Sequence, residues 1–243
     1  MTTSRRERPK SFIPGLVPTL NSRGFMSESL DPFSQRFVEY AALCTAPVLD
    51  MGCAYGIATR AALERGAFVH ACDMEAGHVE IVLDETPPEQ RARLTVSVGT
   101  LPDVAFPDAA FAAILCSRVL HFMLGPDIRR ALADMARWLQ PQGRLFLVAD
   151  TPYSGFWRGA AAAYEQRKAA GVEWPGFIED LGALLPDGRL PAGMLSYLNP
   201  LDPDLLAREC ERAGLVVEDT GFVGRPGDVS AKHHAGAIAR RPG

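Results

Sequence analysis

The apolar positions of the chain follow two alternating patterns between residues 31 and 243. Short runs that are almost entirely apolar are separated by longer stretches in which apolar residues recur at helical spacing. The short runs predict strands that are buried on both faces, and the longer stretches predict amphipathic helices. Their alternation predicts an α/β fold in which helices cover a parallel sheet.

The pattern places these elements in a definite order along the chain. An Asp-Pro pair followed by apolar residues at helical spacing predicts a first helix over Asp31–Leu43. A Pro-Gln-Gly turn at 141–143 precedes the fifth strand. Strands are expected at 47–52, 67–74, 93–99, 111–117, 144–150, 215–223 and 234–240, and further helices at 58–66, 75–86, 127–140 and 202–214.

Two segments depart from this alternation. Residues 1–24 are rich in Pro, Arg, Ser and Gly, which predicts an irregular arm. Residues 151–200 carry many Pro, Gly and aromatic residues, and only 157–170 has a helical pattern. A long irregular segment within a compact domain is typically a lid or a binding element. We therefore predict one domain over 31–243 with a substrate-covering insertion at 151–200, and an N-terminal arm at 1–30 as a second candidate lid.

Composition and charge narrow the class of protein. The chain has 243 residues, of which 47% are hydrophobic and 22% charged, as expected for a globular domain with a substantial core. A net charge of −4 argues against a nucleic acid as the main partner. No apolar stretch is long enough for a membrane span or a signal peptide. The five cysteines form no CxxC pair, so we expect reduced thiols in a cytoplasmic protein and no disulfide framework or zinc site.

The stretch VLDMGCAYG, residues 48–56, places an acid between a buried strand and a glycine turn. Such a turn exposes backbone N–H groups to a ligand above it. A dinucleotide requires GxGxxG, whereas the register from Gly52 continues with Ala54 and Ile57. The carboxylate of Asp50 would also repel a pyrophosphate. The turn therefore disfavours a dinucleotide.

A cationic cofactor fits the same stretch better. S-adenosylmethionine carries a sulfonium and an ammonium group, and both favour a carboxylate neighbour such as Asp50. A second acid, Asp73, ends the next strand, where a carboxylate can accept hydrogen bonds from two ribose hydroxyls. An acid at a strand end is often only a helix cap. The two acids together with the glycine turn favour S-adenosylmethionine.

Several motifs resemble the class I family of S-adenosylmethionine-dependent methyltransferases. VLDMGCAYG and ACDME resemble its first two motifs, and VGTLPDVAFPDAAFAAIL resembles the stretch that holds the adenine. SRVLHFM and LQPQGRLFLVAD resemble the loop after the fourth strand and the turn before the fifth. The resemblance covers about Pro47 to Asp150. It implies a three-layer, Rossmann-like sheet of seven strands whose last strand is antiparallel, with a lid inserted after the fifth strand.

The resemblance also implies cofactor-binding residues. Ala54 replaces the middle glycine of the family motif, which is tolerable if its φ stays negative, and Thr100 stands where the family has an acid beside the adenine. Asp50, Gly52, Ala54 and Gly56 are predicted to line the methionine end of the cofactor, and Asp73 and Met74 to hold its ribose and adenine. Thr100 and Leu101 are predicted to flank the adenine base, and Ser117 to continue the floor of the pocket.

Catalytic residues are harder to assign from sequence. His121 follows the fourth strand and is a candidate general base, with packing in the loop as the alternative. Tyr153 is a candidate hydrogen-bond donor to the substrate, and His234 is a further candidate base. No cluster of acids indicates a metal site. The residues predicted to contact the substrate are Phe25, His121, Tyr153, Trp157, Tyr164, Trp174 and Tyr197, although the aromatic ones could equally form the insertion's own core.

The function expected from these features is methyl transfer from S-adenosylmethionine to a small apolar or aromatic metabolite. O- or N-methylation in secondary metabolism is the favoured reaction, with S-adenosylhomocysteine as the product. Two alternatives stay open: a non-catalytic protein that binds the cofactor for regulation, and a methyltransferase that acts on protein or tRNA. The sequence does not distinguish a monomer from a homodimer.

Overall fold

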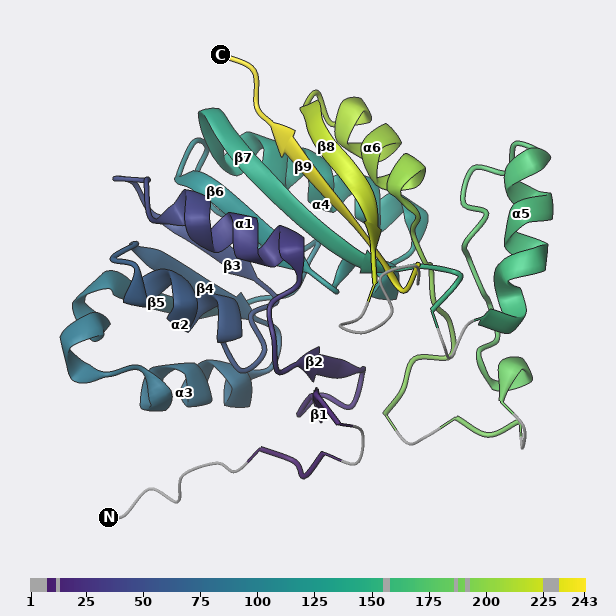
Figure 1. The fold of residues 1–243 in the computed structure, drawn as a ribbon, viewed down its shortest axis with the longest axis horizontal. Helices are drawn as coiled ribbons and strands as arrows, with labels where there is room; N and C mark the ends of the chain where they lie inside the picture. The colour runs from purple at the N-terminus through teal and green to yellow at the C-terminus, as the bar shows by residue number, and fades with distance from the viewer. Residues whose placement is uncertain (1–7, 12–13, 155–157, 186–187, 191–192, 225–231) are drawn as a thin grey trace.

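The structure, a computed structural model, describes residues 8–11, 14–154, 158–185, 188–190, 193–224 and 232–243. Its centre is a seven-stranded sheet in the order β5-β4-β3-β6-β7-β9-β8 (Figure 1). The strands are β3 Val48–Met51, β4 Val69–Asp73, β5 Leu94–Val98, β6 Phe111–Ser117, β7 Leu139–Asp150, β8 Val216–Val223 and β9 His234–Arg240.

The strand directions confirm the predicted topology. The neighbours from β5 to β7 are all parallel, whereas β9 is antiparallel to both β7 and β8. The chain moves outward from β3 to β4 and β5, and then returns to the other side of β3 with β6. This reversal leaves a crevice beyond the carboxyl ends of β3 and β6, where open α/β sheets bind ligands.

Helices cover both faces of the sheet because successive strand residues point to opposite faces. On β3, Val48 packs in one apolar cluster with Phe37 and Leu63, whereas Leu49 packs in a second cluster with Ile128. Helices α1 Pro32–Ala41, α2 Ile57–Glu64 and α3 Ala76–Glu85 lie on the first face, and α4 Gly125–Trp138 and α6 Pro203–Arg212 lie on the second (Figure 1). Short 3-10 helices are η1 Pro88–Arg93, η2 Leu120–Phe122, η3 Arg158–Ala160 and η4 Gly182–Leu184.

The arm before α1 is more regular than its composition predicts. Two short strands, β1 Leu16–Pro18 and β2 Phe25–Ser27, pair as an antiparallel hairpin. The hairpin packs its apolar residues against Tyr55 and Ile81, so tertiary contacts, and not local propensity, give it structure.

The predicted Pro-Gln-Gly turn is also placed differently in the structure. β7 already begins at Leu139, and the pairing of β6 with β7 shifts register between Phe111 and Ala113. Gln142 has a φ of +66° within this irregularity. The three residues therefore form an irregular part of the strand, and not a turn that precedes it.

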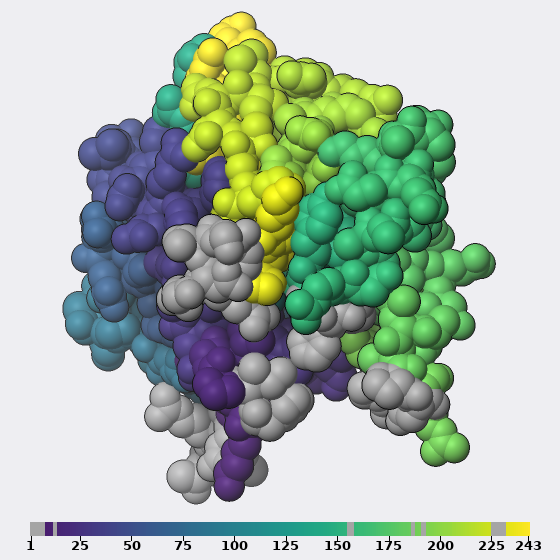
Figure 2. Space-filling model, turned by 45° about the vertical axis from the view of Figure 1, so that its right-hand side comes forward, coloured from purple at the N-terminus to yellow at the C-terminus, as the bar shows by residue number. Residues whose placement is uncertain are grey.

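Within the segment after β7, Ile178, Leu181 and Leu198 pack in one apolar cluster with Phe122 of the loop after β6. The helix of this segment, α5 Ala161–Ala169, stands apart from the sheet beyond α6 (Figure 1). In Figure 2, the green residues of α5 and the purple N-terminal residues lie on different parts of the surface. No helix within the described residues is long and apolar enough to cross a membrane.

Candidate active site

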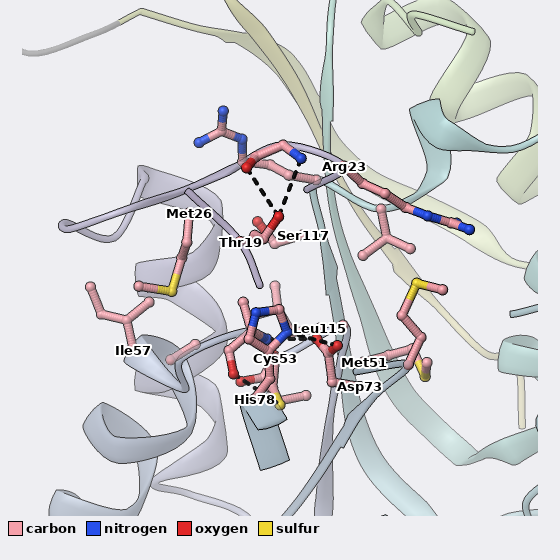
Figure 3. A pocket seen from close by; sticks show the side chains of 18 of the residues that line it. Thr19, Arg23, Met26, Met51, Cys53, Ile57, Asp73, His78, Leu115 and Ser117 are labelled. Atoms are coloured by element: carbon pink, nitrogen blue, oxygen red, sulfur yellow. Dashed lines mark hydrogen bonds and ion pairs between the residues drawn. The ribbon is translucent and has the colours of Figure 1, made fainter. Parts of the chain in front are cut away.

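A pocket opens at the carboxyl ends of β3, β4 and β6 (Figure 3). Each of these strands contributes its last residues and the loop that follows it. The N-terminal hairpin and the start of α1 supply the opposite wall. The lining residues fall within 19–34, 50–58, 73–78, 99–101 and 115–123.

The glycine turn after β3 forms the floor of this pocket. Gly52 has a φ of +78°, and a Cβ atom there would lie 2.3 Å from Cγ2 of Val119. Gly56, with a φ of +72°, is the N-cap of α2. The backbone N–H of Gly52 donates to the carbonyl of Cys72 on β4, 2.8 Å away. Glycine is therefore required at position 52 both for the turn conformation and for the close approach of β6's loop.

Ala54 departs from the sequence prediction. Its φ is +44°, in the left-handed region, whereas the prediction for a non-glycine residue at this position was a negative φ. The cause is a hydrogen bond from the Ala54 N–H to Oδ2 of Asp73, 2.8 Å away. The β3 turn and the end of β4 are thereby joined, at a conformational cost of about 1 kcal/mol for alanine.

Asp50 is a buried carboxylate at the pocket. Its side chain is 3% exposed, and Oγ1 of Thr59 donates a hydrogen bond to its Oδ2 at 2.6 Å. Burial raises the pKa of Asp50 to about 6, against the lowering effect of that hydrogen bond. A cationic ligand group beside Asp50 would offset this desolvation, because it favours the ionised form.

Asp73 is buried as well and already holds three hydrogen bonds. Its Oδ1 accepts from the backbone N–H of Glu75 and from Nδ1 of His78, both at 2.9 Å, and its Oδ2 accepts from Ala54. A carboxylate has about four acceptor positions. The remaining acceptor position is on Oδ2, which suits a hydrogen bond from a ribose hydroxyl.

The other residues predicted to hold the cofactor also lie at this pocket. Met74 follows Asp73, and Thr100 and Leu101 follow β5. Ser117 ends β6 and lies 3.5 Å from Ser34 of α1, measured between the hydroxyl oxygens. All nine predicted cofactor residues except Gly56 are among the lining residues, and Gly56 lies in the same turn.

The predicted bases, in contrast, gather behind the pocket. His121 is 2% exposed and does not line the pocket in the described part of the chain. Its Nδ1 accepts the backbone N–H of Asp150 at 3.1 Å, and burial lowers its pKa to about 4. His234 lies on the other side of the same acid, with Nδ1 3.0 Å from Oδ1.

Asp150 is the centre of this second cluster. Burial alone would raise its pKa, but His121, Arg118 and His234 beside it hold that pKa well below its usual range. Nε of Arg118 lies 3.6 Å from Oδ1 of Asp150. We call Asp150, Arg118, His121 and His234 the Asp150 cluster. Within this cluster, the carboxylate of Asp150 lies beside the guanidinium of Arg118 and the ring of His234.

Most of the aromatic residues predicted to contact the substrate lie elsewhere. The hydroxyl group of Tyr153 donates a hydrogen bond to Glu165. Burial raises the pKa of Tyr153, and the contact with Glu165 raises it further. Tyr164 is fully buried, Trp174 lies between the guanidinium groups of Arg129 and Arg208, and Tyr197 lies beside Phe177. Trp157 is outside the described residues. Of the predicted set, Phe25 lines the pocket.

Several lining residues were not anticipated from the sequence. Thr19, Arg23 and Met26 of the N-terminal segment lie across the pocket from Asp73 and His78 (Figure 3). No local pattern marks them, because their segment is joined to the pocket by contacts such as that of Leu20 with His78, which spans more than fifty residues of chain. His78 had one usable signal, since it is a polar residue on the otherwise apolar buried face of α3. The described residues contain no group of three metal-ligating side chains that could hold an ion.

Comparisons with known proteins agree with this geometry. Residues 49–147 match the family described as "Methyltransferase domain". Magnesium-protoporphyrin O-methyltransferase of Rhodobacter capsulatus is 32% identical over 37% of this chain and 39% of its own length. An uncharacterized methyltransferase of Mycobacterium tuberculosis is 30% identical over 62% of this chain and 56% of its own.

A solved structure extends the match over the whole fold. The glycopeptide N-methyltransferase MtfA, solved with S-adenosylmethionine, has a TM-score of 0.60 and 20% identity, covering 89% of this chain and 90% of its own. The chain spans only 39% and 56% of the lengths of the two sequence relatives. The domain match identifies residues 49–147 as a methyltransferase domain, and the strand order with its antiparallel last strand gives the chain the class I, Rossmann-like fold of S-adenosylmethionine-dependent methyltransferases.

Proposed function

We propose that the protein binds S-adenosylmethionine in this pocket and transfers its methyl group to a small molecule. The observation that carries the proposal is the pair Asp50 and Asp73. Both are buried, both lie near the carboxyl ends of adjacent parallel strands, and both line one pocket around a glycine turn. Two carboxylates attract cationic groups and accept hydrogen bonds from hydroxyl groups of a ligand, whereas they repel a pyrophosphate.

The chain's residues have separate tasks in this proposal. Asp50 faces the positively charged end of the cofactor, and Asp73 accepts a hydrogen bond from its ribose. The glycine turn lets the backbone approach the ligand closely. When bound, S-adenosylmethionine supplies an electrophilic methyl group on a positively charged sulfur. The protein then has to hold the acceptor in line with that methyl group and keep water out.

The acceptor side of the pocket supports a small, largely apolar substrate. The apolar residues that line it include Phe25, Met26 and Leu30 of the N-terminal segment and Phe122 and Met123 of the loop after β6. Thr19, Asn21 and Arg23 add polar groups on the same wall. Apolar walls with a few polar groups are typical of small-molecule sites. The sequence relative named for magnesium-protoporphyrin O-methylation is consistent with an acceptor of this class. The five free thiols support a reducing, cytoplasmic setting.

One observation favours a second candidate, a protein that binds the cofactor without transferring methyl. The three predicted proton-handling residues, His121, Tyr153 and His234, are not among the described lining residues. An acceptor that must lose a proton would then depend on another base.

Release of S-adenosylhomocysteine separates the two candidates. The purified protein is incubated with S-adenosylmethionine and three acceptor panels: small phenols, amines and carboxylic acids; bulk tRNA; and mixed proteins. We expect turnover with a member of the first panel. Turnover only with tRNA or protein would contradict the small-molecule proposal. Cofactor binding without turnover in any panel would favour the non-catalytic candidate.

A further inference from the structure

His78 of α3 joins the floor of the pocket to its N-terminal wall. Nδ1 of the ring lies 2.9 Å from Oδ1 of Asp73. Nε2, on the opposite side of the ring, accepts the backbone N–H of Leu20 at 3.0 Å. The side chain is 1% exposed, so water does not compete for either bond. A single buried ring therefore connects the acid under the pocket with the segment over it.

The hydrogen bonds define the protonation of His78. A backbone N–H can only donate, so Nε2 must be the acceptor in the contact with Leu20. The ring proton then sits on Nδ1, which donates to the carboxylate of Asp73. This arrangement uses both nitrogens of a neutral ring. It also fills an acceptor position on Oδ1 and so leaves Oδ2 for a ligand.

Tyr55 strengthens the attachment of the same segment. Its hydroxyl donates to the carbonyl of Pro18 at 2.6 Å, and its ring meets the ring of His78 edge-on with centroids 4.8 Å apart. Val17 packs in an apolar cluster with Tyr55 and Ile81. Residues 17–20 are thereby fixed on the patch formed by Tyr55 and His78, ahead of the lining residues that follow.

We infer that His78 is a positioning residue that couples closure of the N-terminal segment, residues 17–30, to cofactor binding at Asp73. This inference rests on the proposed function. His78 holds the Asp73 carboxylate in one orientation only while its ring is fixed, and the Leu20 N–H helps to fix that ring. Because coupling is reciprocal, a ligand that hydrogen-bonds to Asp73 also stabilises the Leu20–His78 bond.

The two ring bonds can be tested separately by substitution. His78→Asn keeps a donor near the Nδ1 position and cannot reach Leu20, whereas His78→Gln places an acceptor near the Nε2 position. His78→Ala removes both bonds. Tyr55→Phe removes the bond to Pro18 and leaves Asp73 untouched, so it reports on the segment if a His78 variant does not fold. Circular dichroism checks that each variant is folded.

Hydrogen exchange at the Leu20 amide is the direct readout. We expect its protection to fall about tenfold in His78→Ala and His78→Asn, as for loss of one buried hydrogen bond, and to be largely kept in His78→Gln. Adding S-adenosylhomocysteine should raise the protection of Leu20 in the wild type and not in His78→Ala. In Tyr55→Phe, Leu20 protection and affinity for S-adenosylhomocysteine should both decrease.

Two results would overturn the inference. The first is unchanged Leu20 protection in His78→Ala or, if that variant does not fold, in Tyr55→Phe. The second is an equal rise in protection on adding S-adenosylhomocysteine to the wild type and to His78→Ala. These differ from failure of the proposed function, which would appear as no binding of S-adenosylhomocysteine to the folded wild type.

Discussion

Two aspartate–histidine clusters lie at the carboxyl edge of the same sheet, one at β4 and one at β7. Asp73 and His78 form the first, which lines the pocket. Asp150 forms the second with His121 and His234 behind the pocket. Both acids are hydrogen-bonded and both are strand ends. The clusters differ in the partners of the acid: Asp73 keeps an acceptor position toward the pocket, whereas Asp150 lies beside the guanidinium of Arg118 and shares a hydrogen bond with His234.

The difference shows that residue type and strand position do not by themselves make a site. The strand order reverses between β3 and β6, so the loops after these two strands leave an open crevice, and Asp73 at the end of β4 borders it. At the end of β7, the antiparallel β9 brings His234 directly against Asp150 and closes the space. In the proposed function, the same pair of residue types faces a ligand in one place, whereas in the other it is enclosed by the fold.

The largest expected effect is a loss of cofactor affinity on substitution of Asp73, which is not expected for Asp150. Asp73→Ala should weaken cofactor binding by on the order of 3 kcal/mol, more than a hundredfold, because a charge-assisted acceptor is lost and the Ala54 and Glu75 amides lose their partner. Calorimetric titration with S-adenosylhomocysteine measures it. Asp73→Asn, which keeps the shape, is the control for a collapsed turn. An unchanged dissociation constant in both variants would mean that Asp73 does not bind the ribose.

The next effect tests the Asp150 cluster through pH. The pKa of His121 is lowered to about 4, so the unfolded chain takes up a proton between about pH 6.5 and 4 that the folded chain does not. The His121 contribution to the free energy of unfolding should therefore fall by on the order of 3 kcal/mol as the pH drops through that window. Urea unfolding of the wild type and His121→Gln measures the difference between the two.

The variant comparison also removes an opposing contribution. The pKa of Asp50 is raised to about 6, so protonation of the folded chain adds stability as the pH falls, equally in both proteins. Parallel pH curves would show that His121 is not buried as described. A methyl transfer rate that falls about a hundredfold in His121→Gln would restore His121 as a general base, in spite of its place behind the pocket.

A smaller effect compares aromatic residues on the two candidate lids. Phe25→Ala should lower kcat/KM for the acceptor about tenfold, because Phe25 lines the pocket and loses apolar contact. Tyr197→Ala is the matched control, since Tyr197 is also half-buried but lies beside Phe177. Steady-state kinetics should show no change for it. The reverse result would make residues 151–200 the substrate cover, as the sequence predicts.

The smallest effect concerns the turn that joins Asp50 to Asp73. Ala54→Gly removes the strain of a positive φ but adds freedom to the unfolded chain, so the two contributions partly cancel. Thermal unfolding should show a change of less than about 1 kcal/mol in stability, with cofactor affinity kept. A strong destabilisation would mean that the methyl group of Ala54 packs in the native turn.

The sequence is informative where function depends on local geometry. Asp50, Gly52 and Asp73 were found because a glycine turn between a strand and a helix can be recognised from neighbouring residues. The parallel sheet and its antiparallel last strand followed from the apolar pattern and the resemblance. Ala54 shows the limit even here, because its φ is set by Asp73 across the turn.

The cover of the pocket could not be predicted in the same way. Leu20 meets His78 and Tyr55 meets Pro18 only after the fold has formed, and no periodicity encodes contacts of that separation. Aromatic character was a poor guide in the insertion, since Tyr164 packs in the main apolar core and Trp174 lies beside Arg129 of α4 and Arg208 of α6. A His at position 121 is equally compatible with a base and with a buried acceptor.

Titration calorimetry of S-adenosylhomocysteine into wild type, Asp73→Asn and Asp150→Asn, each checked for folding, tests the central claim most directly. The wild type should bind one ligand per chain, Asp73→Asn should bind far more weakly, and Asp150→Asn should bind like the wild type. No binding to the folded wild type, or equal weakening in both variants, would contradict the assignment of the pocket between β3 and β4 to the cofactor.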